Sequence, residues 1–405
     1  MKRLLYLVTC IVLIAVLLTG CGSTGGNVSF TMDKIDETVV RRNSSFAWEI
    51  FRELNKVDED KNIFISPLSI STALSMTYQG ARDTTREAMA EALQYEGIET
   101  NTVNQSYKNL LRYLEQADSK VDLSINNSIW IREGEDIKED FLTGNREFFD
   151  AYITELDFSR QDAPNKINNW IDDATKGKIE KMIEGPISPQ VVMYLINAIY
   201  FKGQWSERFK EENTVSAKFY ATEGTPQDIK MMRRTGEVEY ARGDDYKAVR
   251  LPYGKGKIAM YAILPQEGVL LNDFIAAMDE EKWHKIRKNV AKKEDVILQI
   301  PRFKIEYGIK ELKDALTALG MGEAFSDRAI FSGIRNGIFI SNVLHKAVIE
   351  VNEEGSEAAG ATVVIMKESA AVEPPTFIAN RPFIFIIADE ETGTILFLGK
   401  YCDPA

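Results

Sequence analysis

Cysteine and histidine are scarce in this chain of 405 residues, which contains three cysteines and two histidines. Cys10 lies in an apolar leader that ends at Cys21, so Cys402 is left as the one thiol of the folded part and no disulfide framework can form. The histidines, His284 and His345, lie far apart and have no metal-ligand spacing with the cysteines. We therefore expect neither a disulfide-stapled scaffold nor a metal site.

Motifs of the common enzyme and nucleotide-binding classes are also missing. The chain has no G-x-x-x-x-G-K-S/T loop, no G-x-G-x-x-G and no G-x-S-x-G. A Ser-His-Asp triad through His345 stays open as an alternative, although a histidine inside an apolar stretch is more often a hydrogen-bonded core residue. His284 lies in a charged segment that predicts a surface helix. We expect a protein without enzymatic activity and without a cofactor.

Basic residues are outnumbered by acidic ones, 49 against 61, which gives a net charge of −12. Nucleic-acid binding depends on basic surfaces, so we do not expect a nucleic-acid partner. With 44% hydrophobic and 27% charged residues, the composition is that of an ordinary globular protein. No Pro/Gly/Ser-rich linker interrupts the chain after residue 30, which favours one large folded unit.

The first 21 residues have the pattern of a targeting signal. Lys2 and Arg3 precede an apolar run over residues 4–18, which is shorter than the ~20 residues that a membrane-spanning helix needs. The run ends in Leu-Thr-Gly-Cys at Cys21, which resembles the processing and lipidation site of prokaryotic lipoproteins.

This N-terminal pattern predicts a lipoprotein signal peptide over residues 1–20, a lipid on Cys21 and a flexible tether over residues 21–30. We accordingly expect an extracytoplasmic protein, anchored by its lipid to the cell membrane or the outer membrane. An uncleaved anchor with an incidental cysteine is the alternative.

Hydrophobic periodicity places most helices in the first half of the chain and most strands in the second. We expect helices over residues 36–54, 67–79, 82–93, 106–116, 139–149, 165–175, 273–278, 281–288 and 310–319. We expect strands over residues 62–66, 121–132, 191–201, 237–251, 257–264, 295–305 and 339–352, and a C-terminal hairpin over residues 383–400. Helices grouped early and strands grouped late predict an α+β fold.

Residues 353–375 are the most informative segment, because they have a strand pattern where a loop is expected. They follow the predicted strand 339–352 and contain no turn dipeptide in their first half. One face of an extended chain would carry only uncharged residues, namely Ser356, Ala358, Gly360, Thr362, Val364 and Met366, while Glu357 and Lys367 fall on the other. Small residues at its start would let this segment enter between existing strands without a clash. The pattern predicts a loop segment that can form an additional strand between existing ones.

Five segments together resemble the serpin family, in serpin order and at serpin spacing. They cover residues 62–89, 167–179, 195–205, 345–362 and 377–387. The resemblance implies a single domain over residues 31–405, with three β-sheets, eight or nine helices and an exposed reactive loop. It also implies an inhibitor that a serine protease attacks as a substrate and that traps the protease when the cleaved loop inserts into the central sheet. A cysteine protease as the target, and a non-inhibitory carrier, chaperone or decoy, stay open; we expect a monomer.

The resemblance assigns the hinge of the reactive loop to ten residues, Glu353, Glu354, Gly355, Ser356, Glu357, Ala358, Ala359, Gly360, Ala361 and Thr362. Counting from Glu353 in the family register places the reactive bond at Ser369–Ala370. Counting back from residues 380–383 moves it toward Ala371–Val372, and Glu368–Ser369 is within reach. A small residue before the bond implies an elastase- or subtilisin-like target, while Lys367 leaves a trypsin-like one open.

Outside the loop, the resemblance assigns a polar cluster that lets the central sheet open, formed by Ser66, Ser69, Asn197 and His345. Trp205 matches the tryptophan beneath the point where the loop begins to insert, and Arg302 is expected to pair with Glu353 at the base of the loop. The alternative for the cluster is that each residue only caps or fills its local surroundings. Trp205 has a plain core role as its alternative.

Overall fold

The computed structural model describes residues 30–222, 224–356 and 374–404. These residues form nine α-helices and three short 3-10 helices. The α-helices are α2 (Glu37–Val57), α3 (Pro67–Tyr78), α4 (Asp83–Ala92), α5 (Thr100–Gln116), α6 (Glu139–Phe149), α7 (Ala163–Ala174), α8 (Leu271–Ala276), α9 (Glu280–Asn289) and α10 (Lys313–Ala318). The 3-10 helices are η1 (Met32–Lys34), η2 (Glu211–Asn213) and η3 (Met321–Phe325). None of the helices in these ranges is long and apolar enough to cross a lipid bilayer.

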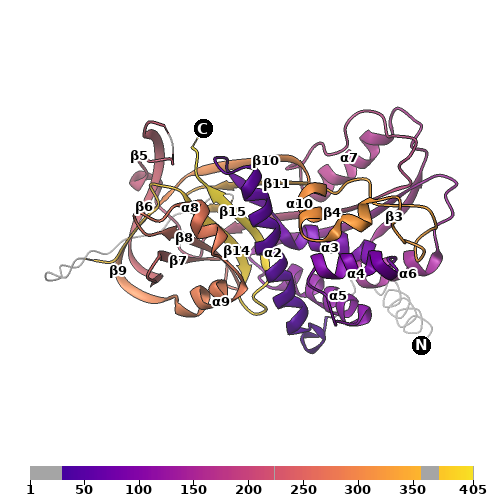
Figure 1. Ribbon diagram of the computed structural model, residues 1–405. Helices are drawn as coiled ribbons and strands as arrows, with labels where there is room; N and C mark the ends of the chain where they lie inside the picture. Colours follow the sequence, from indigo (N-terminus) through magenta and orange to yellow (C-terminus); the bar gives the residue numbers. More distant parts are fainter. Residues whose placement is uncertain (1–29, 223, 357–373, 405) are drawn as a thin grey trace, which may run out of the picture. The chain divides into compact units, whose positions relative to one another are not determined.

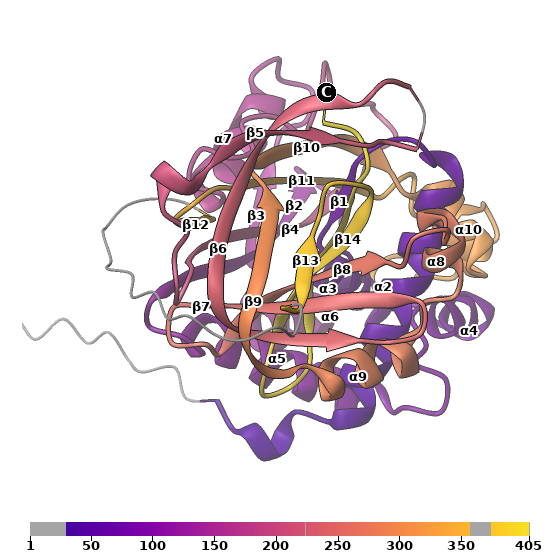
Figure 2. The ribbon, with the colours of Figure 1, turned by 90° about the vertical axis from the view of Figure 1, so that its left-hand side faces the viewer.

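The strands of the described residues form three sheets (Figures 1 and 2). The largest contains, in spatial order, β1 (Ile63–Ile65), β15 (Ile395–Tyr401), β14 (Phe383–Asp389), β8 (Ile258–Pro265), β7 (Tyr246–Tyr253), β6 (Gln227–Arg242), β9 (Ala291–Pro301) and β13 (Thr376–Ile378), with β5 (Val215–Phe219) also paired to β6. The second contains β10 (Phe303–Glu311) and β11 (Leu344–Val351). The third contains β12 (Gly355–Ser356), β4 (Met193–Gln204), β2 (Val121–Arg132) and β3 (Tyr152–Leu156). The predicted α+β class, with three sheets and eight or nine helices, is confirmed.

Helix α3 is buried along nearly its whole length, and its sequence explains how this is possible. Pro67 occupies the first helical position, and the side chain of Ser66 accepts a hydrogen bond from the backbone N–H of Ser69 at 3.1 Å. The hydroxyls of Ser71 and Thr72 donate to the carbonyl oxygen of Leu68. Because its hydroxyls find partners either within the helix or, for Ser69 and Ser75, on neighbouring elements, α3 can lie in the interior at little polar cost.

The C-terminal hairpin is the centre of the main core. Every residue of β14 and β15 is buried, and the ring of Phe64 stacks on both Phe385 and Phe397, with centroids 5.8 and 5.2 Å apart. Helix α2 crosses this hairpin (Figure 1) and buries Trp48, whose ring lies 6.5 Å from that of Trp283 in α9. Aromatic packing thus joins β1 to the C-terminal hairpin and α2 to α9.

Two long predicted strands are wrong in the same way. Residues 237–251 are not one strand, because the chain turns at Gly243 between β6 and β7, where Arg242 pairs with Lys247. Residues 295–305 straddle the end of β9 and the start of β10, which belong to different sheets. The change of sheet falls at Pro301, which has no N–H to continue a ladder. Figure 2 shows β9 between β6 and β13.

Candidate functional site

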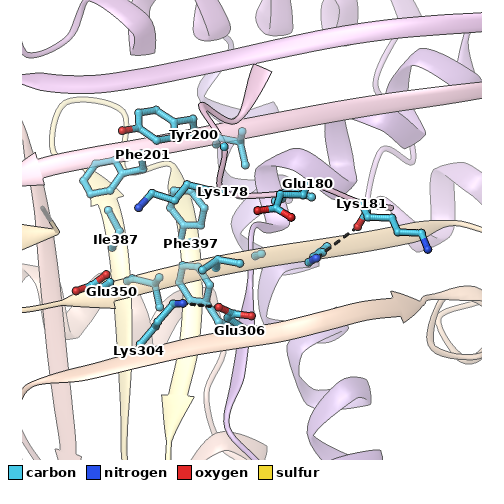
Figure 3. Close-up of a pocket in the computed structure, with 18 residues that line it drawn as sticks. Lys178, Glu180, Lys181, Tyr200, Phe201, Lys304, Glu306, Glu350, Ile387 and Phe397 are labelled. Atoms are coloured by element: carbon cyan, nitrogen blue, oxygen red, sulfur yellow. Dashed lines mark hydrogen bonds and ion pairs between the residues drawn. The ribbon is translucent and has the colours of Figure 1, made fainter. Parts of the chain in front are cut away.

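A gap separates β4 from β11. β11 pairs with β10 and β4 pairs with β2, and within the described residues β12 alone lies between the two, at one end. Beyond β12, toward the middle of β4 and β11, the gap is a hollow of about 440 Å³, lined by Ile199 to Phe201 of β4 and Lys346 to Glu350 of β11. Figure 3 shows Phe397 and Ile387 of the hairpin beneath it, and the charged pair Lys304 and Glu306 at its rim. Two strand edges therefore face each other across an apolar floor.

The hinge residues enter this gap at the end where β4 finishes, which we call its upper end. Gly355 and Ser356 form β12, which runs antiparallel to β4 and pairs with Gln204 and Gly203. Gly355 has φ +142°, and a Cβ at this position would lie 2.2 Å from the carbonyl oxygen of Gly203. Only glycine fits there, because any side chain would collide with the backbone of β4. The remaining hinge residues, Glu357, Ala358, Ala359, Gly360, Ala361 and Thr362, lie outside the described residues.

Trp205 lies directly under β12. Its backbone N–H donates to the carbonyl oxygen of Glu354 at 2.8 Å, and its indole N–H donates to that of Asn352 at 2.9 Å. The indole stacks on Tyr253 with ring centroids 4.4 Å apart. Trp205 thus holds the turn from β11 into β12 by two hydrogen bonds while its ring belongs to the core of the largest sheet, so the two roles considered for it are compatible.

Glu353 is anchored mainly by a residue that the sequence did not point to. Its carboxylate accepts a hydrogen bond from the hydroxyl of Thr214 at 2.7 Å, and its carbonyl oxygen accepts one from the N–H of Phe209 at 2.9 Å. Arg302 lies 3.8 Å from the same carboxylate, and its side chain is 55% exposed whereas that of Glu353 is 7% exposed. The expected ion pair is thus a long one, and Thr214 supplies the short contact. Thr214 follows η2 in an unremarkable loop, so no local pattern marks it.

The four residues of the predicted polar cluster meet where α3, β4 and β11 converge. The backbone N–H of Ser66 donates to Nε2 of His345 at 3.1 Å, and the Ser66 hydroxyl donates to the carbonyl oxygen of Leu396 at 2.7 Å. The Ser69 hydroxyl donates to the carbonyl oxygen of Asn197 at 3.3 Å. The side chain of Asn197 donates to Asn127 of β2 at 2.7 Å. Through α3, the cluster thus connects both sides of the gap.

His345 cannot act as the base of a catalytic triad in this arrangement. The residue is 4% exposed, and its Nε2 accepts a backbone N–H rather than a serine hydroxyl. Burial lowers the pKa of His345 from 6.5 to about 4, so the imidazole is neutral at physiological pH. Because Nε2 is an acceptor, the proton of the neutral ring resides on Nδ1. The geometry disfavours the hydrolase alternative.

A covering segment closes the gap on one face. Residues 177–181 line the hollow, and the carbonyl oxygen of Lys181 accepts a hydrogen bond from Nζ of Lys346 on β11 at 3.4 Å. The side chain of Asn168 in α7 binds Met182 and Ile183 through their backbone groups at 2.8–2.9 Å. α7 and this segment pack on β2 and β4 through a separate apolar cluster that includes Trp130 and Ile196. The cover is thus fixed mainly to one side of the gap, and it contacts β11 on the other through Leu344 and through one long, exposed hydrogen bond.

Some predicted site residues fall outside the described residues. These are Cys21 and the four residues of the reactive-bond window, Glu368, Ser369, Ala370 and Ala371. The described chain stops at Ser356 and resumes at Pro374–Pro375, just before β13. Both attachment points of the predicted reactive loop are thus defined, one on β4 and one on β9.

Comparisons with known proteins agree with this architecture. The family model described as "Serpin (serine protease inhibitor)" matches residues 41–404. A serpin-like protein of Thermococcus kodakarensis is 37% identical over 91% of this chain and 86% of its own length. The leukocyte elastase inhibitor of Bos taurus is 34% identical over 91% of this chain and 100% of its own length. The chain belongs to the serpin family, which its model describes as serine protease inhibitors.

Solved structures extend the comparison to two different kinds of serpin. The thermophilic serpin tengpin, in its native state, superposes with a TM-score of 0.82 at 32% identity, covering 93% of this chain and 96% of tengpin. Thyroxine-binding globulin, in a complex with thyroxine, superposes with a TM-score of 0.80 at 29% identity, covering 90% of this chain and 99% of its own. The family therefore includes both inhibitors and a binding protein with this fold.

Proposed function

We propose that this protein is an irreversible suicide-substrate inhibitor of elastase- or subtilisin-like serine proteases. The observation that carries the proposal is the gap between β4 and β11 with the loop hinge already paired at its upper end. Since β12 is antiparallel to β4 and turns back from β11 through the Asn352–Gly355 bridge, a strand that continues β12 would be antiparallel to both neighbours. The hinge thus supports direct extension of β12 down the gap.

The energy available from such an insertion is large. Between Met193 and Lys202 the edge of β4 that faces the gap pairs with no other strand of the described residues, nor does the facing edge of β11. A new central strand would form on the order of ten backbone hydrogen bonds, each worth ~1 kcal/mol net. Burial of its apolar face adds ~25 cal/mol per Å². The sum is comparable with the ~5–15 kcal/mol that stabilises a whole domain, enough to distort a protease attached to the strand.

The chemistry is supplied by the protease. Its serine hydroxyl attacks the carbonyl carbon of Ser369, the Ser369–Ala370 peptide bond breaks, and an ester forms while the new amino group of Ala370 departs with the proton relayed by the protease histidine. The hinge then extends β12 into the gap and carries the esterified protease with it. Inhibition results when insertion is faster than hydrolysis of the ester. The covering segment must shift for this, and the weak Lys346–Lys181 contact supports such a movement.

One experiment tests the proposal. The purified domain is mixed with elastase-, subtilisin- and trypsin-like proteases, and each mixture is analysed by denaturing electrophoresis and by sequencing of the released peptide. We expect a denaturant-stable complex with at least one of the first two classes and a new N-terminus at Ala370. Cleavage without a stable complex would show a substrate rather than an inhibitor, and would overturn the proposal.

A carrier function is the second candidate. The likeness to thyroxine-binding globulin supports it, as does a second hollow of about 870 Å³ between α2, α9 and the β14–β15 turn. This volume lies in the usual range of small-molecule sites. Trp283, Tyr261 and Arg287 line it and offer aromatic and cationic contacts. Ligand binding with no covalent protease complex would favour the carrier.

We further propose that Cys21 carries a lipid and that the protein acts close to a membrane surface. The tether of about ten residues would span roughly 17 Å as a flexible coil. An inhibitor held at this distance would meet proteases that attack the envelope of its own cell.

A further inference from the structure

Three basic side chains gather beside the strand to which the C-terminal end of the reactive loop is attached. Arg242 and Lys247 are direct cross-strand partners at the end of the β6–β7 hairpin. Nζ of Lys247 donates to the carbonyl oxygen of Thr376 at 3.2 Å, at the first residue of β13. Arg381, three residues beyond β13, donates to the carbonyl oxygen of Pro265 at 2.6 Å, and Pro265 pairs with Tyr246 beside Lys247.

No carboxylate of the described residues lies within ion-pair distance of these cations. Among the described residues, none of the three forms an ion pair, and the exposed side chain of Arg242 forms no hydrogen bond. Burial first, and then the charges of Arg242 and Arg381, lower the pKa of Lys247. Like charges directly opposite one another in a sheet cost stability, so the fold maintains this cluster against its own electrostatics.

The acidic residues near this cluster do not balance it. Asp245, in the same turn as Arg242, is paired with Lys282 instead. Asp244 and Glu267 are both exposed. The negative charge of Glu267 raises the pKa of Lys247 and of Arg381, which opposes the lowering of both pKa values by burial. Three cations thus face two unpaired carboxylates, on a chain whose net charge is −12. The patch is positive where the rest of the protein is predominantly negative.

The position of the patch relative to the loop limits what can cover it. Ala370 lies six positions before Thr376 in the chain, so the proposed reactive bond lies within about 22 Å of the contact that Lys247 makes with β13. A protease domain of about 225 residues has a radius of gyration of about 17 Å. A protease docked at the bond is therefore large enough to reach surface at this distance.

We propose that Arg242, Lys247 and Arg381 form a secondary docking surface for an acidic region of the target protease. This inference rests on the proposed inhibitory function and adds the chemistry of the partner. Opposite charges placed beside the reactive bond accelerate and orient the first encounter, and they act on the association rate more than on the final covalent complex. The target we infer is thus a small-pocket serine protease with an acidic surface next to its active site.

Arg242→Glu is the informative variant, because the side chain is exposed and forms no hydrogen bond or ion pair with the described residues that folding would lose. We measure second-order inhibition rates with an acidic subtilisin-like and a basic elastase-like protease, at low salt and at 0.5 M salt. Lys138→Glu is the matched control: it makes the same charge change at the exposed start of α6, far from β9 (Figure 1). With the acidic protease we expect Arg242→Glu to lower the rate about threefold to tenfold at low salt and far less at high salt, where charges are screened.

The two proposals fail in different ways. If the unmodified protein forms no covalent complex with any protease, the inhibitory function is wrong. If it forms one, but Arg242→Glu and Lys138→Glu have the same rate or Arg242→Glu slows both proteases equally, the docking surface is wrong and the inhibitor stands. A slower reaction with the acidic protease, together with an unchanged or faster one with the basic protease, supports the surface.

Discussion

The backbone N–H of Ser66 donates a 3.1 Å hydrogen bond to Nε2 of His345, which joins the start of α3 to the strand on one side of the gap. A neutral imidazole accepts this bond, and an imidazolium cannot. The hydrogen bond between α3 and β11 therefore requires the neutral form of one buried ring. Because the bond links the buried helix α3 to β11, its loss would weaken the contact between α3 and a strand edge against which an inserted strand must pack.

We predict that acid weakens the native state through His345. Its pKa is lowered from 6.5 to about 4, so the unfolded chain binds more protons than the folded one between these values. The stability that the neutral ring provides is complete above pH 6.5 and is lost as the pH falls toward 4, by about 3 kcal/mol in total. Urea unfolding midpoints from pH 7.5 to 4.5 measure this for the native protein and for His345→Gln. The variant should be less stable at pH 7.5, and the difference should shrink on acidification; a constant difference would contradict the coupling.

A second prediction concerns the anchoring of Glu353. Thr214→Val removes the 2.7 Å hydrogen bond to a buried carboxylate and should cost about 1.5–3 kcal/mol. Arg302→Gln removes a 3.8 Å contact from an exposed side chain and should cost at most about 1 kcal/mol. The two variants are each other's controls in urea denaturation. A larger loss for Arg302→Gln would restore the ion pair as the main anchor.

The residues that sequence reasoning placed correctly are those fixed by local rules. α3 was predictable from Ser66, Pro67 and a run of apolar and hydroxyl residues, and the C-terminal hairpin from two apolar runs around a glycine turn. The long strand predicted over residues 237–251 failed because both flanks of the short turn at Gly243, Asp244 and Asp245 have strand-like patterns, and the turn residues were not taken into account. Alternation alone does not tell a strand from a hairpin when the turn is short.

The gap itself could not be predicted from the sequence, because no local sequence pattern shows which distant strands pair with one another. β4 and β11 are as apolar as paired strands, and only the resemblance to a family and the pattern of residues 353–375 suggested that they stand apart. The role of Thr214 could not be predicted from the sequence for a similar reason. Its role depends on Glu353, which is 139 residues away in the chain.

The third prediction tests the glycine that enters the gap. Gly355→Ala places a methyl group against the carbonyl oxygen of Gly203 and strains a backbone with φ +142°. β12 should detach from β4, and insertion should slow, so that more inhibitor is cleaved for each protease trapped. Gly337→Ala is the control, because Gly337 also has a positive φ of +71° but nothing lies within 4 Å of its added Cβ. Equal stoichiometries of inhibition for the two variants would mean that β12 has no part in insertion.

The fourth prediction concerns the N-terminus. Cys21→Ser removes the thiol that the lipid would modify, and we expect the protein in the soluble fraction or as an unprocessed precursor. Fractionation of cells and mass measurement of the N-terminal peptide distinguish these states from the native one. Cys402→Ser serves as the control, since Cys402 is buried in the folded body. A Cys21→Ser protein that is still anchored and trimmed normally would refute lipidation.

The last prediction separates an inhibitor from a substrate. The alternation of residues 353–375 assigns Ser356 to the face that becomes buried on insertion, and β12 already pairs Ser356 with Gly203 of β4. An arginine there would have to lose its hydration between packed strands, at a cost of several kcal/mol. Insertion should then lag behind hydrolysis of the acyl-enzyme.

Ser356→Arg should therefore be cleaved at the same bond and at a similar initial rate, yet release active protease. Glu357→Arg, one residue further and on the opposite face by the same alternation, should inhibit almost normally because its side chain stays in water. The measurement is the number of inhibitor molecules consumed per protease molecule trapped, which should rise at least tenfold for Ser356→Arg. If both variants consume the same number, the alternation is misassigned or insertion is not how the protease is trapped.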